Sequence, residues 1–133
     1  MSIYNSERQL KNLENQIQNA DYPDENKKLI KQYKNKLFVR GLKTDTVRNN
    51  LRRIHSFSKY IMIPFNEVDI SDMEDYIGYL ERTVKSENSK CDQKSVIKRF
   101  YKWLYGTENE PDITSWISIK RKKSDRKLPD ELL

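Results

Sequence analysis

The apolar residues of this 133-residue chain recur at intervals of three or four positions, the spacing that places side chains on one face of an α-helix. This pattern predicts a weak helix in the first 20 residues and four stronger ones. The four stronger helices are expected at about residues 25–40, 44–61, 71–84 and 89–105, with a short turn or helix at 111–117. The chain has only three glycines and four prolines and few β-branched runs, so folds of short β-strands are not expected and the predicted fold class is all-α.

The ends of the predicted helices carry recognisable signals. Gly41 and Gly106 follow the second and fifth apolar stretches, where a glycine can adopt the left-handed conformation that ends a helix. Ser71, with Glu74 three residues later, has the spacing of a capping box and predicts the start of the fourth helix.

Two of the predicted helices are apolar on one face and basic on the opposite face. In residues 44–61 the polar face carries Arg48, Arg52, Ser56 and Lys59. In residues 89–105 it carries Lys94, Lys98 and Lys102, with Arg99 beside them.

Charges of one sign are grouped along the chain. Residues 27–59 hold eleven Lys or Arg and one acid, whereas residues 60–89 hold two basic residues and seven acids. Residues 90–105 and 119–127 are again basic, and the whole chain carries a formal charge of +6. A surface charged only for solubility mixes its signs more evenly, so the grouping favours a polyanion as the partner, with the acidic helix turned away.

The composition sets further expectations. The 35% of hydrophobic residues and the aromatic side chains (eight Tyr, four Phe and two Trp) supply one modest core, as expected for a single globular domain. The single cysteine excludes an internal disulfide, and no apolar run approaches the ~20 residues that span a bilayer. We therefore expect a soluble, cytoplasmic protein without a membrane partner.

Common types of active site are not supported by the sequence. His55 and Cys91 are each the only residue of their kind, so metal clusters of His and Cys and nucleophile–histidine pairs are not supported. The three glycines are scattered and form no phosphate loop. We expect no metal, no cofactor and no catalysis by this chain alone, and we interpret His55 as a plain surface residue.

Two basic helix faces and a basic tail favour binding to nucleic acid over the simpler interpretation of a solvated surface. Lys and Arg can neutralise phosphates, and hydroxyl groups near a helix start can fix the position of the backbone. The candidate DNA-binding residues are Lys43, Thr44, Thr46, Arg48, Arg52, Ser56, Lys59, Lys90, Lys94, Lys98, Arg99, Lys102, Lys120, Arg121 and Lys122.

Several motifs resemble, in order and spacing, the N-terminal part of tyrosine recombinases, the phage-integrase family. The motifs are "GLKTDTVRNNLRRIHSF", "EVDISDMEDYIGYL", "VIKRFYKWLYG", "EPDITSWI" and "RKLPDELL". The last one is similar to the linker that leads into that family's catalytic domain. No segment matches the catalytic domain's own set of Arg, Lys, His and nucleophilic Tyr.

The resemblance implies a SAM-like orthogonal bundle of four or five helices, built from two helical hairpins, that forms half of a clamp around a recombination half-site. It implies an N-terminal extension at 1–22, a core-binding domain at 23–117 and a basic linker at 118–133. The implied partners are double-stranded DNA, a C-terminal catalytic domain and other recombinase protomers, and the implied location is the nucleoid. The ending then belongs to an interdomain linker, and the chain holds DNA for chemistry performed elsewhere.

Two other functions fit the same charges. A helical protein-interaction module could bind an acidic partner through its basic faces. A short stand-alone protein could occupy recombination sites and block the full enzyme.

Overall fold

The computed structural model describes residues 3–119, and these residues form helices and connecting loops. The helices are α1 (Ile3–Gln18), α2 (Asp24–Val39), α3 (Thr44–Ile61), the 3₁₀ turn η1 (Phe65–Glu67), α4 (Ile70–Thr83), α5 (Glu87–Tyr105) and α6 (Asp112–Ser115). The predicted all-α class is confirmed, and each predicted helix is present within a few residues of its expected bounds.

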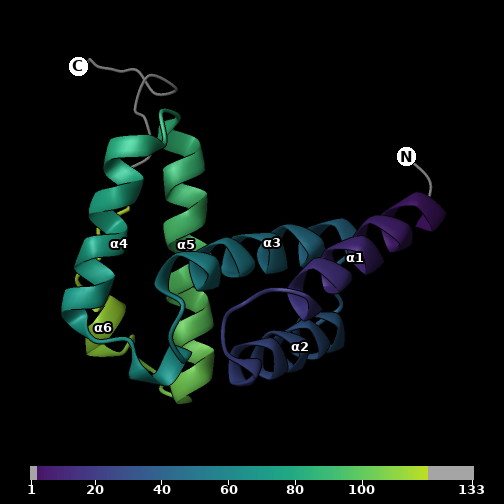
Figure 1. Cartoon of the computed structure of the whole chain (residues 1–133), viewed down its shortest axis with the longest axis horizontal. Coiled ribbons are helices and arrows are strands. Elements are labelled where there is room, and N and C mark those ends of the chain that lie inside the picture. The colour runs from purple at the N-terminus through teal and green to yellow at the C-terminus, as the bar shows by residue number, and fades with distance from the viewer. Residues whose placement is uncertain (1–2, 120–133) are drawn as a thin grey trace, which may run out of the picture.

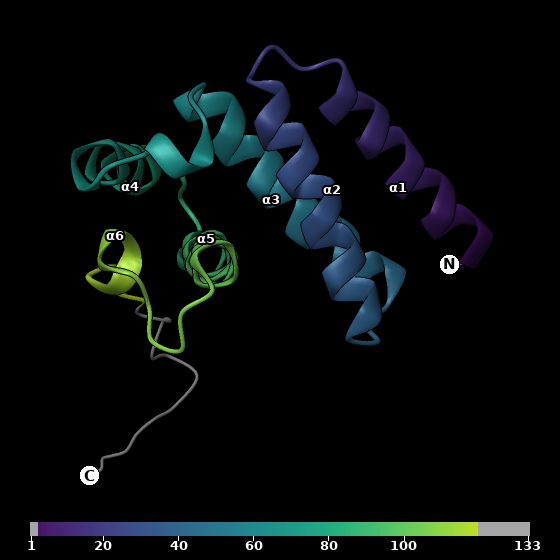
Figure 2. The same cartoon turned by 90° about the horizontal axis from the view of Figure 1, so that it is seen from below.

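Helix α3 is the central element of the bundle. Helices α1 and α2 pack along it, while α5 crosses it and pairs with α4 (Figure 1). Figure 2 looks nearly along α4 and α5, whereas α1, α2 and α3 run across the view, so the two groups are roughly perpendicular. The short helix α6 packs against both α4 and α5. This is the orthogonal arrangement of two hairpins, α2–α3 and α4–α5, that the sequence predicted.

Helix α1 is better ordered by packing than its diluted apolar pattern suggests. Leu10, Leu13 and Ile17 are buried, and they join the same hydrophobic core as the residues of α2 and α3. The helix therefore lies fixed against α3. The domain boundaries at residues 22 and 117 stay predictions.

Aromatic side chains fill the centre of the core. Phe65, at the start of η1, is fully buried between Phe57 of α3 and Phe100 of α5, with ring centroids 6.0 and 4.8 Å away. Tyr76 of α4 meets Phe57 edge to face at 4.8 Å. These contacts join helices from both hairpins. Aromatic pairs at such distances add to the free energy gained by burial alone, so they stabilise the packing of one hairpin on the other.

A fully buried amide holds the loop between the two hairpins. The side chain of Asn26 in α2 donates hydrogen bonds to Ser58 Oγ (3.0 Å) and to the Ile63 carbonyl (2.9 Å). Its oxygen accepts the backbone N–H of Phe65 at 2.9 Å. The Tyr101 hydroxyl donates to the Phe65 carbonyl at 2.8 Å, so both backbone groups of Phe65 are bonded to side chains. These bonds fix where the second hairpin starts.

One predicted helix end is confirmed in detail and one is wrong. The N–H groups of Gly41 and Leu42 bond the carbonyls of Phe38 and Leu37, and Gly41 has φ +86°, which is the Schellman arrangement. Helix α4, in contrast, is capped by Asp69 and Asp72, which exchange side-chain to backbone hydrogen bonds, and not by the Ser71–Glu74 pair. The capping box therefore begins two residues earlier than predicted.

The interpretation of His55 as a surface residue is wrong. His55 is only 6% exposed, and its Nδ1 shares a hydrogen bond of 2.8 Å with the Tyr22 hydroxyl. Burial lowers the pKa of His55, and the charge of Lys59 lowers it further. The fold therefore favours the neutral imidazole, whose hydrogen bond with Tyr22 ties the α1–α2 connection to α3.

We expect Asn26→Ala to lower the free energy of unfolding by about 2–4 kcal/mol, because it leaves buried backbone groups at Ile63 and Phe65 without partners. Urea titration followed by circular dichroism measures the loss. Asn35→Ala, on the exposed face of the same helix, is the matched control and should change stability by no more than about 0.5 kcal/mol. Equal losses in the two variants would contradict the role assigned to Asn26.

We expect stability to fall as the pH drops below the ordinary histidine pKa of 6.5, since the pKa of His55 is lowered in the folded state. The unfolded chain then binds a proton that the folded chain does not bind, and the loss is complete below the folded-state pKa. Urea titrations between about pH 7.5 and 5.5 measure this slope, because His55 is the only histidine. His55→Gln should remove the slope in that range, and an unchanged slope in this variant would contradict the assignment.

Candidate nucleic-acid interface

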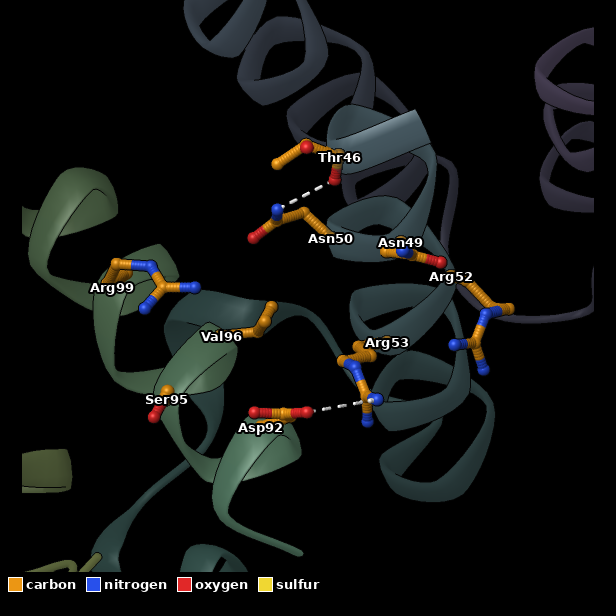
Figure 3. A pocket seen from close by; sticks show the side chains of 9 residues that line it. All are labelled: Thr46, Asn49, Asn50, Arg52, Arg53, Asp92, Ser95, Val96 and Arg99. Carbon is orange, nitrogen blue, oxygen red and sulfur yellow. Dashed lines mark hydrogen bonds and ion pairs between the residues drawn. The ribbon is translucent and has the colours of Figure 1, made fainter. Parts of the chain in front are cut away.

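Two helices from different hairpins enclose a polar groove, which we call the α3–α5 groove. Figure 3 shows α3 on one side of it and α5, carrying Arg99, on the other. The groove is lined by Thr46, Asn49, Asn50, Arg52, Arg53, Asp92, Ser95, Val96 and Arg99. Since its walls come from separate hairpins, its shape depends on the crossing of α5 over α3.

Within the part of the chain that the structure describes, no carboxylate lies within ion-pair distance of Arg52 or Arg99. Both side chains are exposed, one on each helix. Arg99 also makes a side-chain hydrogen bond with Tyr33. The exposed guanidinium groups can bind an anion, since five N–H donors in a planar fork suit a phosphate or a base edge.

Other polar groups of the groove support its walls instead. Arg53 donates to Gln93 Oε1 at 3.3 Å and lies 3.9 Å from Asp92, so its charge is engaged with α5 (Figure 3). Gln93 in turn donates to the Arg53 carbonyl at 2.8 Å and to the Tyr76 hydroxyl at 2.7 Å. Asn50 bonds the Thr46 carbonyl within its own helix. These bonds fasten α5 to α3 beneath the exposed cations.

Three further predicted residues lie on the other flank of α3. Arg48, Ser56 and Lys59 line a second groove, between α3 and α1, and Arg52 lines this groove too. Arg48 also makes an ion pair with Asp45, one turn earlier, at 3.6 Å. Arg52 therefore lies at the ridge where the two grooves meet.

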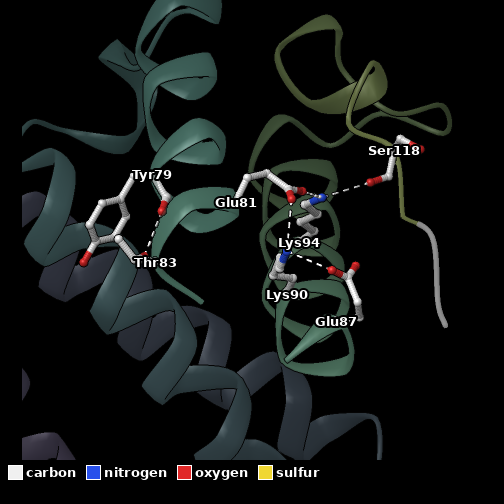
Figure 4. A network of polar contacts seen from close by, with 7 residues as sticks. All are labelled: Tyr79, Glu81, Thr83, Glu87, Lys90, Lys94 and Ser118. Carbon is white, nitrogen blue, oxygen red and sulfur yellow. Dashed lines mark hydrogen bonds and ion pairs between the residues drawn. The ribbon is translucent and has the colours of Figure 1, made fainter. Parts of the chain in front are cut away.

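Of the row predicted on α5, Lys94, Lys98 and Lys102, only Lys102 is exposed, and the predicted Lys90 is buried too. Lys90 and Lys94 line up along α5 and face Glu81 of α4 (Figure 4). Lys98, one turn further along α5, donates to the backbone after α6. The side chains of Lys90, Lys94 and Lys98 are only 9%, 10% and 15% exposed. The acidic helix α4 is the partner of Lys90 and Lys94 rather than an element turned away from them.

Glu81 of α4 is the centre of this contact. It accepts hydrogen bonds from Lys94 at 2.6 Å and from Lys90 at 3.1 Å, and Lys90 also pairs with Glu87 at 2.9 Å (Figure 4). The bonds from Lys94 and Lys90 lower the pKa of Glu81, and the bonds from Glu87 and Glu81 raise the pKa of Lys90. Both lysine charges are therefore already neutralised within the fold.

Two of these lysines also bind backbone carbonyls beyond α6. Lys94 donates to Ser118 at 3.3 Å and Lys98 donates to Ile117 at 2.7 Å. Lys98 is further paired with Glu110 at 3.1 Å. The two lysines hold the chain against α5 as it leaves the bundle.

The remaining predicted residues are scattered. Lys102 is exposed near Arg99, and Lys43 is exposed at the start of α3. Thr46 lines the α3–α5 groove, whereas the Thr44 hydroxyl donates to Glu7 of α1 at 3.0 Å. Lys120, Arg121 and Lys122 lie outside the described residues.

Five polar residues of the α3–α5 groove escaped the sequence prediction: Asn49, Asn50, Arg53, Asp92 and Ser95. Asn49 lies one turn from both Thr46 and Arg52, and Ser95 lies one turn before Arg99. The helical period places each of these two beside a predicted residue, so the same spacing contained the signal.

The described part of the chain holds no group of three or more His, Cys, Asp or Glu that could bind a metal ion. Within residues 3–119 no helix has the length and the apolar character needed to cross a membrane. What the two grooves offer chemically is an array of cations, hydroxyls and amides, which suits the phosphates and bases of a nucleic acid.

Comparison with known proteins gives an independent indication. Residues 30–108, more than half of the chain, match the family model described as the phage integrase N-terminal SAM-like domain. The match runs from α2 to just past α5 and so includes both walls of the α3–α5 groove. Searches of curated proteins and of solved structures gave no match. The steep crossing of the two hairpins agrees with this match. Because the match covers more than half of the chain, the chain belongs to the phage integrase N-terminal SAM-like domain family.

Proposed function

We propose that this chain is the DNA-binding clamp domain of a site-specific tyrosine recombinase and grips one face of a duplex with α3 and α5. The observation that carries the proposal is the pair Arg52 and Arg99, two exposed cations on different hairpins that face one groove. The family to which the chain belongs supports a role in recombination.

The contacts divide by chemistry. Arg52, Arg99 and Lys102 bind phosphates and release the counterions condensed on them, which provides most of the affinity. Thr46, Asn49 and Ser95 add hydrogen bonds from the walls of the groove. Asn and Arg are also the side chains that most often read adenine and guanine in the major groove, so any sequence preference resides in these positions.

The domain performs no chemistry in this proposal. Strand cleavage and joining belong to a separate catalytic domain of the recombinase, reached through the predicted linker at 118–133, and other protomers occupy the neighbouring half-sites. Residues 23–117 are the proposed core-binding unit, and the DNA places the protein at the nucleoid.

We expect the chain to bind a labelled mixed-sequence duplex with a log–log salt slope of about −4 to −5, as for ~4–6 neutralised phosphates. Arg52→Glu combined with Arg99→Glu should weaken binding by roughly tenfold or more and reduce the size of the slope by about 2. Fluorescence anisotropy at several salt concentrations measures both quantities.

Lys28→Glu combined with Lys31→Glu is the matched control, because it changes the net charge equally on exposed positions of α2. This variant should retain nearly all of the affinity. If wild type shows no binding at low salt, or if the Arg52/Arg99 variant binds as well as the control, the proposal fails. An acidic protein partner would then be the better candidate for the basic surface.

A second comparison separates free cations from paired ones on the same helix. Arg99→Gln should reduce the salt slope by about 1 and leave stability nearly unchanged. Lys94→Gln should leave the slope unchanged and lower the free energy of unfolding by about 1–2 kcal/mol, because it removes a bond to Glu81. Salt titrations of DNA binding and urea titrations measure the two effects. A loss of slope in the Lys94 variant with an intact fold would assign that lysine to the DNA contact.

A further inference from the structure

We propose that α1, which precedes the family match at residues 30–108, is a third DNA-contacting helix, and that Asn12 and Gln16 donate hydrogen bonds to the sugar–phosphate backbone of the duplex. This inference rests on the proposed function, since it extends the contact surface of α3 and α5. The site is the second groove described above, which we call the α1–α3 groove.

The geometry places α1 beside the basic flank of α3. Leu10, Leu13 and Ile17 are buried and hold α1 against α3 along one side. Asn12 and Gln16 are exposed and lie one turn apart, so both amides face the same groove. A helix fixed in this way presents its amides without a further cost for ordering its backbone when a ligand binds.

The lining of the α1–α3 groove suits a phosphodiester backbone. The groove has a volume of about 410 Å³ and is lined by Gln9, Asn12, Leu13, Gln16, Arg48, Arg52, His55, Ser56 and Lys59. No acidic residue is among them, although Asp45 pairs with Arg48 at 3.6 Å. The arginines and the lysine supply charge, and the amides and the hydroxyl supply neutral donors.

The other flank of α1 differs. The groove between α1 and α2 contains Glu14, which pairs with Lys34 at 2.6 Å. The same groove contains Lys27, which pairs with Asp24 at 3.4 Å. Lys11 and Lys31 line this groove as well, so it is also basic. It differs from the α1–α3 groove in having an acid, Glu14, among its lining residues and in having two of its lysines engaged in ion pairs.

Unsatisfied atoms also mark the α1–α3 groove. Gln9 Oε1 and Arg48 Nε are buried and have no hydrogen-bond partner, although both residues line this groove. Buried polar atoms are normally bonded, and an unmade bond is costly. Both atoms are shielded from solvent, so a phosphate oxygen would reach the Arg48 Nε–H only after a shift of the side chains. The Gln9 amide can turn about its last torsion to present its donors, because it carries both an acceptor and a donor end.

The α1–α3 and α3–α5 grooves form one continuous surface, because Arg52 lines both of them. A duplex bound to α3 therefore lies between α5 and α1. The DNA would meet three helices rather than two.

The test compares two double variants of the same helix in the full chain. Asn12→Ala with Gln16→Ala removes the donors of the α1–α3 groove, and Asn15→Ala with Gln18→Ala removes equivalent amides from the other flank. Anisotropy with a labelled mixed-sequence duplex should show binding weakened about 10- to 30-fold in the first variant and unchanged in the second. The salt slope should stay constant in both, since neutral amides release no counterions.

A gain-of-contact variant guards against an effect on folding. Gln16→Lys should tighten binding and increase the size of the salt slope by about 1, whereas Gln18→Lys should leave the slope unchanged. Equal affinities for the two alanine variants, or equal slopes for the two lysine variants, would overturn the role of α1. If Arg52→Glu with Arg99→Glu still weakened binding by roughly tenfold or more in that case, the α3–α5 interface would stand and only this inference would fail.

Discussion

The relative position of the two hairpins depends on the buried amide of Asn26. Its three hydrogen bonds join α2, the end of α3 and the start of η1, where Phe65 enters the aromatic core. Phe65 in turn contacts Phe57 and Phe100, one from each hairpin. A backbone carbonyl or N–H buried without a partner is costly, so this loop has few alternative conformations. This loop is not part of the α3–α5 groove. It nevertheless fixes the relative position of the two helices that form the groove's walls.

The net charge of the chain overstates the charge available to a partner. Lys90, Lys94 and Lys98 each find a carboxylate on α4, on α5 or in the loop before α6, so their positive charge is consumed within the fold. Arg52 and Arg99 have no such neighbour among residues 3–119 and remain exposed. A lysine whose ammonium group is paired and whose methylene chain is buried contributes to packing. An exposed arginine, in contrast, keeps its N–H donors available for a ligand.

Helical periodicity was sufficient to predict the helices, the buried stripes and the basic face of α3, because each depends on spacing within one element. Periodicity also placed the lysines of α5 on one face of the helix. It could not show that Lys90 and Lys94 contact Glu81 of α4, because that is a tertiary contact. His55 was misjudged for the same reason, since its partner Tyr22 is 33 residues away. Asn26 lies four residues before Ile30 on the apolar stripe of α2, and a polar residue at such a position signals a buried hydrogen-bonding role.

The lysines of α5 have a mechanical consequence. Lys94 is bonded both to Glu81 and to the Ser118 carbonyl, and Lys98 holds the adjacent carbonyl of Ile117. Tension applied to the chain at Ile119 would therefore pass through Ser118 and Lys94 to α4 before it reached the aromatic core. Charge-assisted hydrogen bonds are strong and directional, so they transmit load better than apolar contacts, which can slide. The bundle is thus built to withstand being pulled from this end, with α4 and α5 sharing the force.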